Sequence, residues 1–462
     1  MKKFFAACLV LCLAVTLCAV PVFAGDDDVA QVEGGSTYPT LQAAIDAVSD
    51  SGKVTLLKDT AEDITIGSGK TIELVLNAKL TNVSGHTIVV KSGANLTIGG
   101  TGTVDNVTNQ SAAIDNEIGG IVILNGGTYT RSAETGASPT QGGKNTFYTI
   151  RNHGTMTINS GVTVNQNGHF SSLVENGFYN GASENPGGGA ATMIINGGNF
   201  SGGINTIKND DYGVLTVYNG TFENTTQAAL LNWNEATVEN GTFESVGPAV
   251  LNGGGDATMD KGTLNLKGGT FTGASGQDAV AAMNGQTSYL NGVDITGGAY
   301  SSDVSLMVAA GSSELVKASG DNRYQVGQYT SSTQGVTAAT QLNNTNVFFE
   351  SLNDAVKQKG VSNVNVVADA TLTQPVPAGV NVTVMGNTTL TASGNLGNVS
   401  FQSGAKLVVP AGQTATVNGK QYSAGAYSVN ADGSLSNPGS STTTSAAPST
   451  AGKANPKTGV AA

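Results

Sequence analysis

The sequence predicts an all-β fold, a solenoid in which short parallel strands of successive repeats stack on one another. The chain has 63 glycines among 462 residues and only 12% charged residues, a composition that disfavours helix bundles and coiled coils because glycine weakens helices. A Gly-Gly-x-aromatic motif and an apolar-x-Asn motif both recur through the middle of the chain. Hydrophobic residues make up 39% of the chain, which is enough to bury a core and argues against disorder over its whole length.

Residues 1–24 have the pattern of a secretory signal peptide. Two lysines precede an apolar run at residues 4–20, and small side chains before the end of the segment predict cleavage between Ala24 and Gly25. The alternative is an uncleaved membrane anchor, for which the run is short. The cysteines of the chain all lie in this segment, so the mature protein is expected to fold without disulfides: Cys8, Cys12 and Cys18.

The net charge of −12 argues against nucleic acid and anionic membrane surfaces as partners. No segment after the signal approaches the length of apolar sequence that crosses a bilayer, so no membrane span is predicted in the mature chain.

A helix is predicted at residues 41–48, before the first strand. Leu41, Ala44, Ile45 and Val48 share one helical face, and Thr40 is in the N-cap position. A helix here would cover the first repeat and hide an open sheet edge, as the ends of solenoids require.

Two residue columns define the repeat. The first is an aromatic residue after glycine: Tyr129, Phe200, Phe222, Phe243, Phe271 and Tyr300. The second is an asparagine after an apolar residue and one intervening residue: Asn116, Asn152, Asn176, Asn209, Asn232, Asn252 and Asn284. Subtraction of the residue numbers gives spacings of 20 to 36 between successive asparagines, typical of short repeats with inserted loops.

Alternating apolar residues between the columns predict short strands, and clusters of Gly, Asn and Asp predict turns. Asparagine at a corner tolerates left-handed geometry, and its amide can bond the asparagine of the next repeat. The fixed place of the aromatic residues after glycine favours an inward stack of rings over an exposed platform for sugars.

The repeats at about residues 60–302 resemble the right-handed parallel β-helix, the pectate-lyase-like architecture found in surface proteins of Gram-positive bacteria. The resemblance implies a β-helix domain at residues 25–302, including its N-terminal cap. It implies no activity, because the repeats are scaffold.

Three further segments follow. Residues 303–341 are expected to form a terminal cap and linker, with a short helix possible near residues 304–310. Residues 342–435 repeat the helix-then-strand pattern of the N-terminus and predict a second, smaller β module. Residues 436–462 are rich in Ser, Thr and Pro and predict an extended tail.

The tail ends in a pentapeptide that resembles a sortase sorting motif, with asparagine in place of the usual leucine: Asn455, Pro456, Lys457, Thr458 and Gly459. The resemblance implies cleavage after Thr458 and attachment to peptidoglycan by sortase. Such motifs precede an apolar stretch and a basic end, whereas only three residues follow here. Either the given sequence stops early or this protein is released.

The acidic and basic sets used by pectate lyases and polygalacturonases are not apparent in the sequence. Neither a metal-binding spacing nor a nucleotide-binding loop appears, so no metal or cofactor is predicted. The residues between the apolar position and the asparagine alternate in sign and are expected to form exposed ion pairs on successive coils. Candidates for ligand contact lie on this face and its corner: Arg151, His153, Lys208, Asp210, Asp211 and Trp233.

These features favour a non-catalytic secreted or wall-attached surface protein, adhesin-like or structural, whose β-helix binds an extracellular glycan or protein. The alternative is a polysaccharide lyase or glycoside hydrolase, suggested by the fold resemblance and by the insertions at residues 131–147 and 177–191, which could equally form a binding surface.

Overall fold

The computed structural model describes residues 27–136, 147–254 and 262–437. The predicted cleavage site at Ala24 and Gly25 and the sorting motif at residues 455–459 therefore lie outside the described residues. The chain forms two units, one of Met1–Thr330 with Leu342–Phe348 and one of Ser331–Gln341 with Phe349–Ala462.

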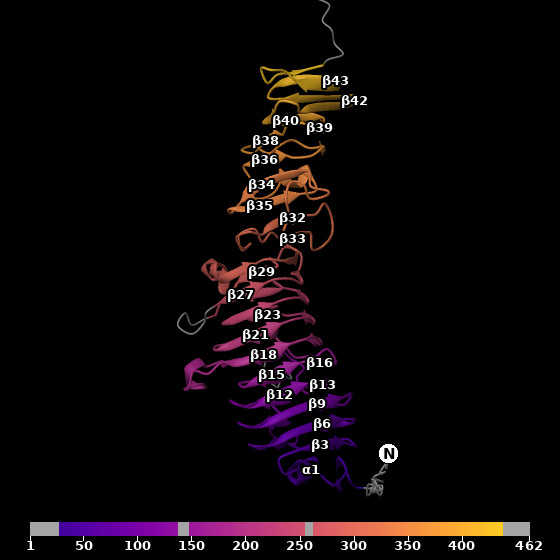
Figure 1. The fold of residues 1–462 in the computed structure, drawn as a ribbon, viewed down its shortest axis with the longest axis vertical. Coiled ribbons are helices and arrows are strands. Elements are labelled where there is room, and N and C mark those ends of the chain that lie inside the picture. The colour runs from indigo at the N-terminus through magenta and orange to yellow at the C-terminus, as the bar shows by residue number, and fades with distance from the viewer. Residues whose placement is uncertain (1–26, 137–146, 255–261, 438–462) are drawn as a thin grey trace, which may run out of the picture. The chain divides into compact units, whose positions relative to one another are not determined.

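The first unit consists of short strands in three sheets, which the chain visits in turn (Figure 1). We call one passage through the three sheets a coil. Strands of successive coils pair in parallel and in register. The first sheet contains β3 Ser51–Leu56, β6 Thr71–Leu76, β9 Asn95–Gly100, β12 Ile121–Leu124, β15 Thr155–Ile158, β18 Ala191–Ile195, β21 Gly213–Val217, β24 Glu235–Val238, β27 Thr263–Leu266 and β30 Val293–Ile295.

The other two sheets follow the same order along the chain. The second sheet contains β4 Thr60–Ala61, β7 Lys79–Thr81, β10 Thr103–Asp105, β13 Gly127–Thr130, β16 Val162–Asn165, β19 Asn199–Ser201, β22 Thr221–Asn224, β25 Thr242–Ser245, β28 Thr270–Thr272 and β31 Gly298–Tyr300. The third contains β5 Ile64–Ile66, β8 Ile88–Val90, β11 Ile114–Asn116, β14 Ile150–Asn152, β17 Val174–Asn176, β20 Asn205–Asn209, β23 Ala228–Asn232, β26 Val250–Asn252 and β29 Val280–Ala282. The fold is thus mostly β with long parallel sheets, consistent with the predicted parallel solenoid.

The N-terminal helix is present where the sequence predicts it. Helix α1 spans Leu41–Ala47, and the Thr40 hydroxyl caps it by accepting a hydrogen bond from the backbone N–H of Ala43. The Glu62 carboxylate accepts two further N–H groups of the first turn, at 2.8 and 3.1 Å, where negative charge is favourable. Two short antiparallel strands, β1 Ala30–Val32 and β2 Thr37–Tyr38, extend the first sheet beside it.

The aromatic column points inward, as predicted, and every ring in it is buried. Five of the rings stack face to face on successive coils, with centroids 4.5 to 5.0 Å apart: Phe200, Phe222, Phe243, Phe271 and Tyr300. The preceding glycine is required at Gly220, where φ is +139° and a Cβ atom would lie 2.9 Å from the ring of Phe222.

The asparagine column forms the predicted ladder of side-chain hydrogen bonds. Each amide from Asn116 to Asn232 donates to the next asparagine at 2.7 to 2.9 Å, and Asn252 ends the ladder. The sequence alignment was wrong at Asn284. Ala282 pairs with Asn252 in the sheet, and Asn284 lies beyond the strand in a 3-10 turn, η2 Met283–Gly285, which precedes η3 Thr287–Gly292.

The first unit ends in antiparallel pairing. β33 Tyr324–Gly327 pairs with both β31 and β32 Ser313–Val316. Residues 305–307 form a turn instead of the short helix considered from the sequence.

The second unit repeats the order of a short helix followed by parallel strands. Helix α2 spans Leu352–Ala355, and β34 Ala338–Leu342 precedes it, whereas β35 Thr345–Phe349 belongs to the first unit except for its last residue. The remaining strands are β36 Asn363–Val366, β37 Ala370–Leu372, β38 Asn381–Val384, β39 Thr389–Ala392, β40 Gly394–Gly397, β41 Val399–Phe401, β42 Lys406–Val417, β43 Lys420–Val429 and β44 Leu435–Ser436. The last two pair antiparallel, whereas β36, β38 and β41 are parallel.

Candidate functional site

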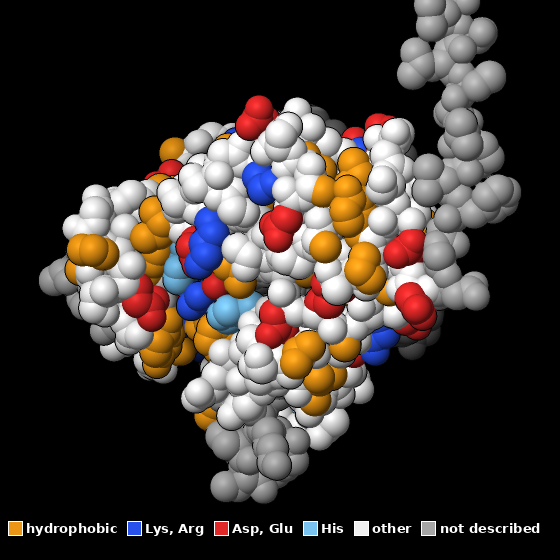
Figure 2. Space-filling view, turned by 90° about the horizontal axis from the view of Figure 1, so that it is seen from below, with side chains coloured by type: hydrophobic (Ala, Val, Ile, Leu, Met, Phe, Trp, Pro, Cys, Tyr) orange, Lys and Arg blue, Asp and Glu red, His pale blue; other side chains and the backbone are white. Residues whose placement is uncertain are grey.

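The outer side of the third sheet carries a column of charged residues. Asp115, Arg151, Glu175 and Lys208 occupy the same position on β11, β14, β17 and β20 and face away from the core, as strand alternation predicts. The expectation that their ion pairs are exposed is wrong, because Asp115, Glu175 and Lys208 are only 3%, 1% and 5% exposed. In Figure 2, Lys, Arg and His side chains gather beside acidic ones in one area of the surface.

Inserted segments bury these charges. Residues 177–190, which contain the 3-10 turn η1 Gly181–Ser183, follow β17 and bring the Tyr179 ring over the Lys208 ammonium. The Trp233 ring, from the corner after β23, lies on the same ammonium, and the two ring centroids are 6.4 Å apart. Tyr179 therefore comes from a loop that interrupts the repeat, whereas Trp233 comes from the regular corner between β23 and β24.

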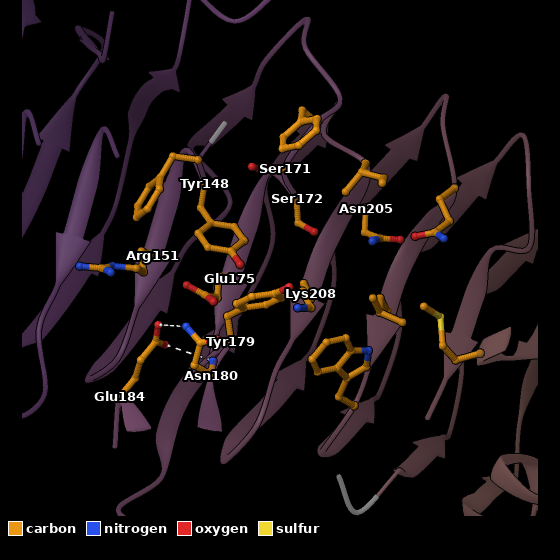
Figure 3. Close-up of a pocket in the computed structure, with 17 residues that line it drawn as sticks. Tyr148, Arg151, Ser171, Ser172, Glu175, Tyr179, Asn180, Glu184, Asn205 and Lys208 are labelled. Atoms are coloured by element: carbon orange, nitrogen blue, oxygen red, sulfur yellow. Dashed lines mark hydrogen bonds between the residues drawn. The ribbon is translucent and has the colours of Figure 1, made fainter. Parts of the chain in front are cut away.

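The column and the loops enclose a pocket of about 620 Å³ (Figure 3). Aromatic, hydroxyl, amide and charged side chains all contribute to its wall. The lining residues are Phe147, Tyr148, Arg151, Phe170, Ser171, Ser172, Glu175, Tyr179, Asn180, Glu184, Ile204, Asn205, Lys208, Gln227, Leu231, Trp233 and Met283.

Both basic residues of the column are paired with acids other than Glu175. Arg151 donates two hydrogen bonds to Asp115, at 2.6 and 2.9 Å. Burial alone would raise the pKa of Asp115, but the bonds and charge of Arg151 outweigh it and lower the pKa.

Lys208 pairs with Asp210. Its Nζ lies 2.6 Å from Oδ2 of Asp210. Burial raises the pKa of Asp210 to about 7; the Lys208 charge opposes this rise and Glu175 adds to it.

The Glu175 carboxylate has no hydrogen-bond partner at either oxygen. Its nearest basic group is Nε2 of His153, at 3.8 Å. In Figure 3 the Tyr148 hydroxyl points toward Glu175, and the two groups interact electrostatically. Burial and then the negative charge of Glu175 raise the pKa of Tyr148 well above its usual value.

Two more polar atoms of the pocket residues lack hydrogen-bond partners. They are Oδ1 of Asn205, an acceptor on a side chain that is 3% exposed, and Nε1 of Trp233, a donor. Buried polar atoms are normally satisfied, so unsatisfied ones that line one cavity indicate groups available to a ligand. By contrast, the Glu184 carboxylate is bonded to the Asn180 amide at 2.8 Å.

The structure separates the six predicted contact residues into two sets. Arg151, Lys208 and Trp233 line the pocket. His153, Asp210 and Asp211 do not. The His153 ring packs 4.4 Å from the Phe178 ring, and Asp210 and Asp211 are buried at the corner after β20.

Sequence reasoning did not single out Tyr148, Tyr179, Glu184 or Asn205, and it read Glu175 as an exposed partner in an ion pair. The signal available for the tyrosines was the position of the insertions, which lie next to the charged column. No periodic pattern marks individual residues inside an insertion.

Within residues 27–136, 147–254 and 262–437 there is no group of three or more His, Asp or Glu side chains placed to hold a metal ion. No helix in the described part of the chain is long and apolar enough to cross a membrane. The chain matches no protein-family model, no curated protein and no solved structure.

Proposed function

We propose that the chain is an exported, wall-attached surface protein of the right-handed parallel β-helix type, and that it binds a glycan in the pocket on the third sheet. One observation carries the proposal. The pocket combines five aromatic side chains with the buried Glu175 carboxylate and the buried Asn205 amide oxygen, neither of which meets the geometry of an accepted hydrogen bond: the aromatic residues are Phe147, Tyr148, Phe170, Tyr179 and Trp233.

This combination matches the chemistry of a sugar ring. A pyranose has an apolar face of C–H groups that packs on aromatic rings and an edge of hydroxyl groups that donate and accept hydrogen bonds. Its hydroxyls would donate to Glu175 and Asn205 and accept from Nε1 of Trp233. The pocket volume lies within the range of small-molecule sites.

Tryptophan fluorescence provides the test, because Trp233 is the sole tryptophan of the chain and lines the pocket. We expect soluble oligosaccharides from a panel of neutral, acidic and amino sugars to change its emission in a saturable way. Phe170→Ala, at a ring that is 43% exposed, should weaken binding on the order of tenfold through lost stacking.

Tyr218→Ala is the matched control, since Tyr218 is 51% exposed and does not line the pocket. This variant should bind as the unmodified protein does. If no oligosaccharide changes the emission, or if both variants bind equally well, the glycan proposal is wrong.

Glycoside hydrolysis is the second candidate, because two carboxylates, Glu175 and Glu184, line the same pocket and glycoside hydrolases use a pair. The third acid nearby, Asp210, has a raised pKa but is buried outside the pocket lining. If new reducing ends appear with the unmodified protein and not with Glu175→Gln, the function is hydrolysis and not binding alone.

Wall attachment is proposed from the sorting motif and the tail. Replacement of Thr458 by Ala should prevent the sortase step and move the protein from the wall fraction into the medium. An unchanged distribution would contradict attachment through this motif.

A further inference from the structure

We infer that the pocket selects a sugar that carries a protonated amine, and that Glu175 is the residue that recognises the ammonium group. The inference rests on the proposed glycan binding and names its substrate class.

On the outer side of the third sheet, both basic residues of the column pair with acids other than Glu175. Arg151 and Lys208 flank Glu175 on the neighbouring strands β14 and β20. Each is engaged elsewhere, Arg151 by two hydrogen bonds to Asp115 and Lys208 by its ion pair with Asp210. Neither neighbouring cation is therefore in direct contact with the Glu175 carboxylate.

The position of Glu175 makes this carboxylate available to a ligand. The side chain is 1% exposed, both oxygens lack hydrogen-bond partners, and the residue lines the pocket. A buried carboxylate is stabilised most by a partner that supplies both hydrogen bonds and positive charge. An ammonium group supplies both, whereas a hydroxyl supplies only a hydrogen bond.

The aromatic residues provide a second attraction for a cation. Aromatic faces carry partial negative charge, and ammonium groups bind over them. The pocket already contains such an arrangement, with Nζ of Lys208 lying 3.6 Å from the ring centroid of Trp233 and 4.5 Å from that of Tyr179. The Tyr148 ring lies next to Glu175 in the same pocket (Figure 3).

The remaining unpartnered atoms favour an amino sugar over a lysine side chain of a protein. Nε1 of Trp233 needs an acceptor and Oδ1 of Asn205 needs a donor. A lysine ammonium has donors only, whereas the hydroxyls of an amino sugar supply both. The net charge of −12 also favours approach of a cationic ligand.

His153 is the competitor for Glu175, at 3.8 Å. The sugars are compared at mildly acidic pH, because the amine of a glucosamine residue is less basic than a lysine amine and is largely neutral at about pH 7.

Three oligosaccharides of equal length that differ mainly at one ring position test the inference: those of chitosan, chitin and cellulose, which carry an ammonium, an acetamide and a hydroxyl there. Binding is measured by Trp233 fluorescence and by calorimetry. We expect the chitosan oligosaccharide to bind on the order of tenfold or more tightly than the other two. Glu175→Gln keeps the shape of the side chain and removes its charge, so it should abolish this preference.

Glu223→Gln is the control, an exposed acid on the second sheet, and should keep the preference. Equal binding of the three sugars overturns the inference and leaves the proposed function standing, whereas no binding of any sugar overturns both. A lysine-rich peptide that binds more tightly than the chitosan oligosaccharide contradicts the assignment to a sugar. The comparison of sugars on the unmodified protein decides the matter even if Glu175→Gln does not fold.

Discussion

Glu314 on β32 is a buried carboxyl that accepts a hydrogen bond from the backbone N–H of Val304 at 3.1 Å. Burial raises its pKa to about 8, and the neighbouring Asp303 adds to the rise. In the unfolded chain the group ionises near its ordinary value of 4.5. Between these two values the folded state binds the extra proton, so the free energy of unfolding falls as the pH rises.

We therefore expect the stability of the first unit to decline from about pH 5 to about pH 8, by on the order of 1 kcal/mol per pH unit. Glu314→Gln removes this titration and should make the decline shallower, with the part due to Asp210, whose pKa is also raised, remaining. Urea unfolding at a series of pH values measures the effect. Glu244→Gln, at an exposed position on β25, should leave the slope unchanged. An equal slope in the Glu314 variant would contradict the assignment.

Residue-scale prediction from the sequence succeeded where a residue belongs to a column and failed where it belongs to an insertion. The outward direction of Arg151, Glu175 and Lys208 follows from strand alternation, and the structure confirms it. Their burial does not follow, because it depends on where the loop that carries Tyr179 lies. That loop has no repeat partner from which its path could be read.

At the scale of the element, the asparagine ladder is a continuous network of side-chain hydrogen bonds along one corner of the third sheet. Asn209 is fully buried, donates to Asn232 and to the backbone carbonyls of Gly213 and Glu235, and accepts from Asn176 at 2.8 Å. The amide satisfies groups in three coils at once. The ladder therefore fixes the register of the third sheet at the corner where the chain leaves it.

Asn209→Ala should destabilise the first unit by about 2–4 kcal/mol, because it leaves buried carbonyls and a neighbouring amide without partners. Equilibrium unfolding in denaturant gives the change. A second, exposed ladder offers the control, since Asn159 bonds Asn125 and Asn196 at 2.7 and 2.8 Å in contact with solvent. Asn159→Ala should cost less than about 1 kcal/mol, because water replaces the lost bonds. If the two variants lose the same free energy of unfolding, burial does not determine how much the ladder stabilises the fold.

The elements themselves were largely predictable, for the same reason that the ladder forms. Each coil places the same residue type at the same corner, so both the asparagine and the aromatic columns appear in the sequence as repeats, and both are found in the structure. Asn284 marks the limit of this reasoning. It has the local pattern of the column, yet it follows the last strand of the third sheet, where no further coil exists to receive its amide.

At the scale of the whole molecule, stability must come from stacking and hydrogen bonding within two separate units, because residues 27–437 contain no cysteine. Phe243 belongs to the first unit, in the middle of its stack of rings, with centroids 4.5 and 5.0 Å from those of its neighbours. Leu390 on β39 is fully buried in the second unit. Truncation of either side chain should destabilise its own unit by about 2–5 kcal/mol.

Differential scanning calorimetry then distinguishes two independent units from one cooperative fold. We expect two transitions, of which Phe243→Ala lowers one and Leu390→Ala lowers the other, because neither substitution removes contacts within the other unit. The larger transition enthalpy should belong to the unit that Phe243→Ala affects, since enthalpy scales with the number of residues that unfold together. A single transition that both variants lower would mean that the two units unfold as one, and the division of the fold at residues 330–349 would then have no thermodynamic counterpart.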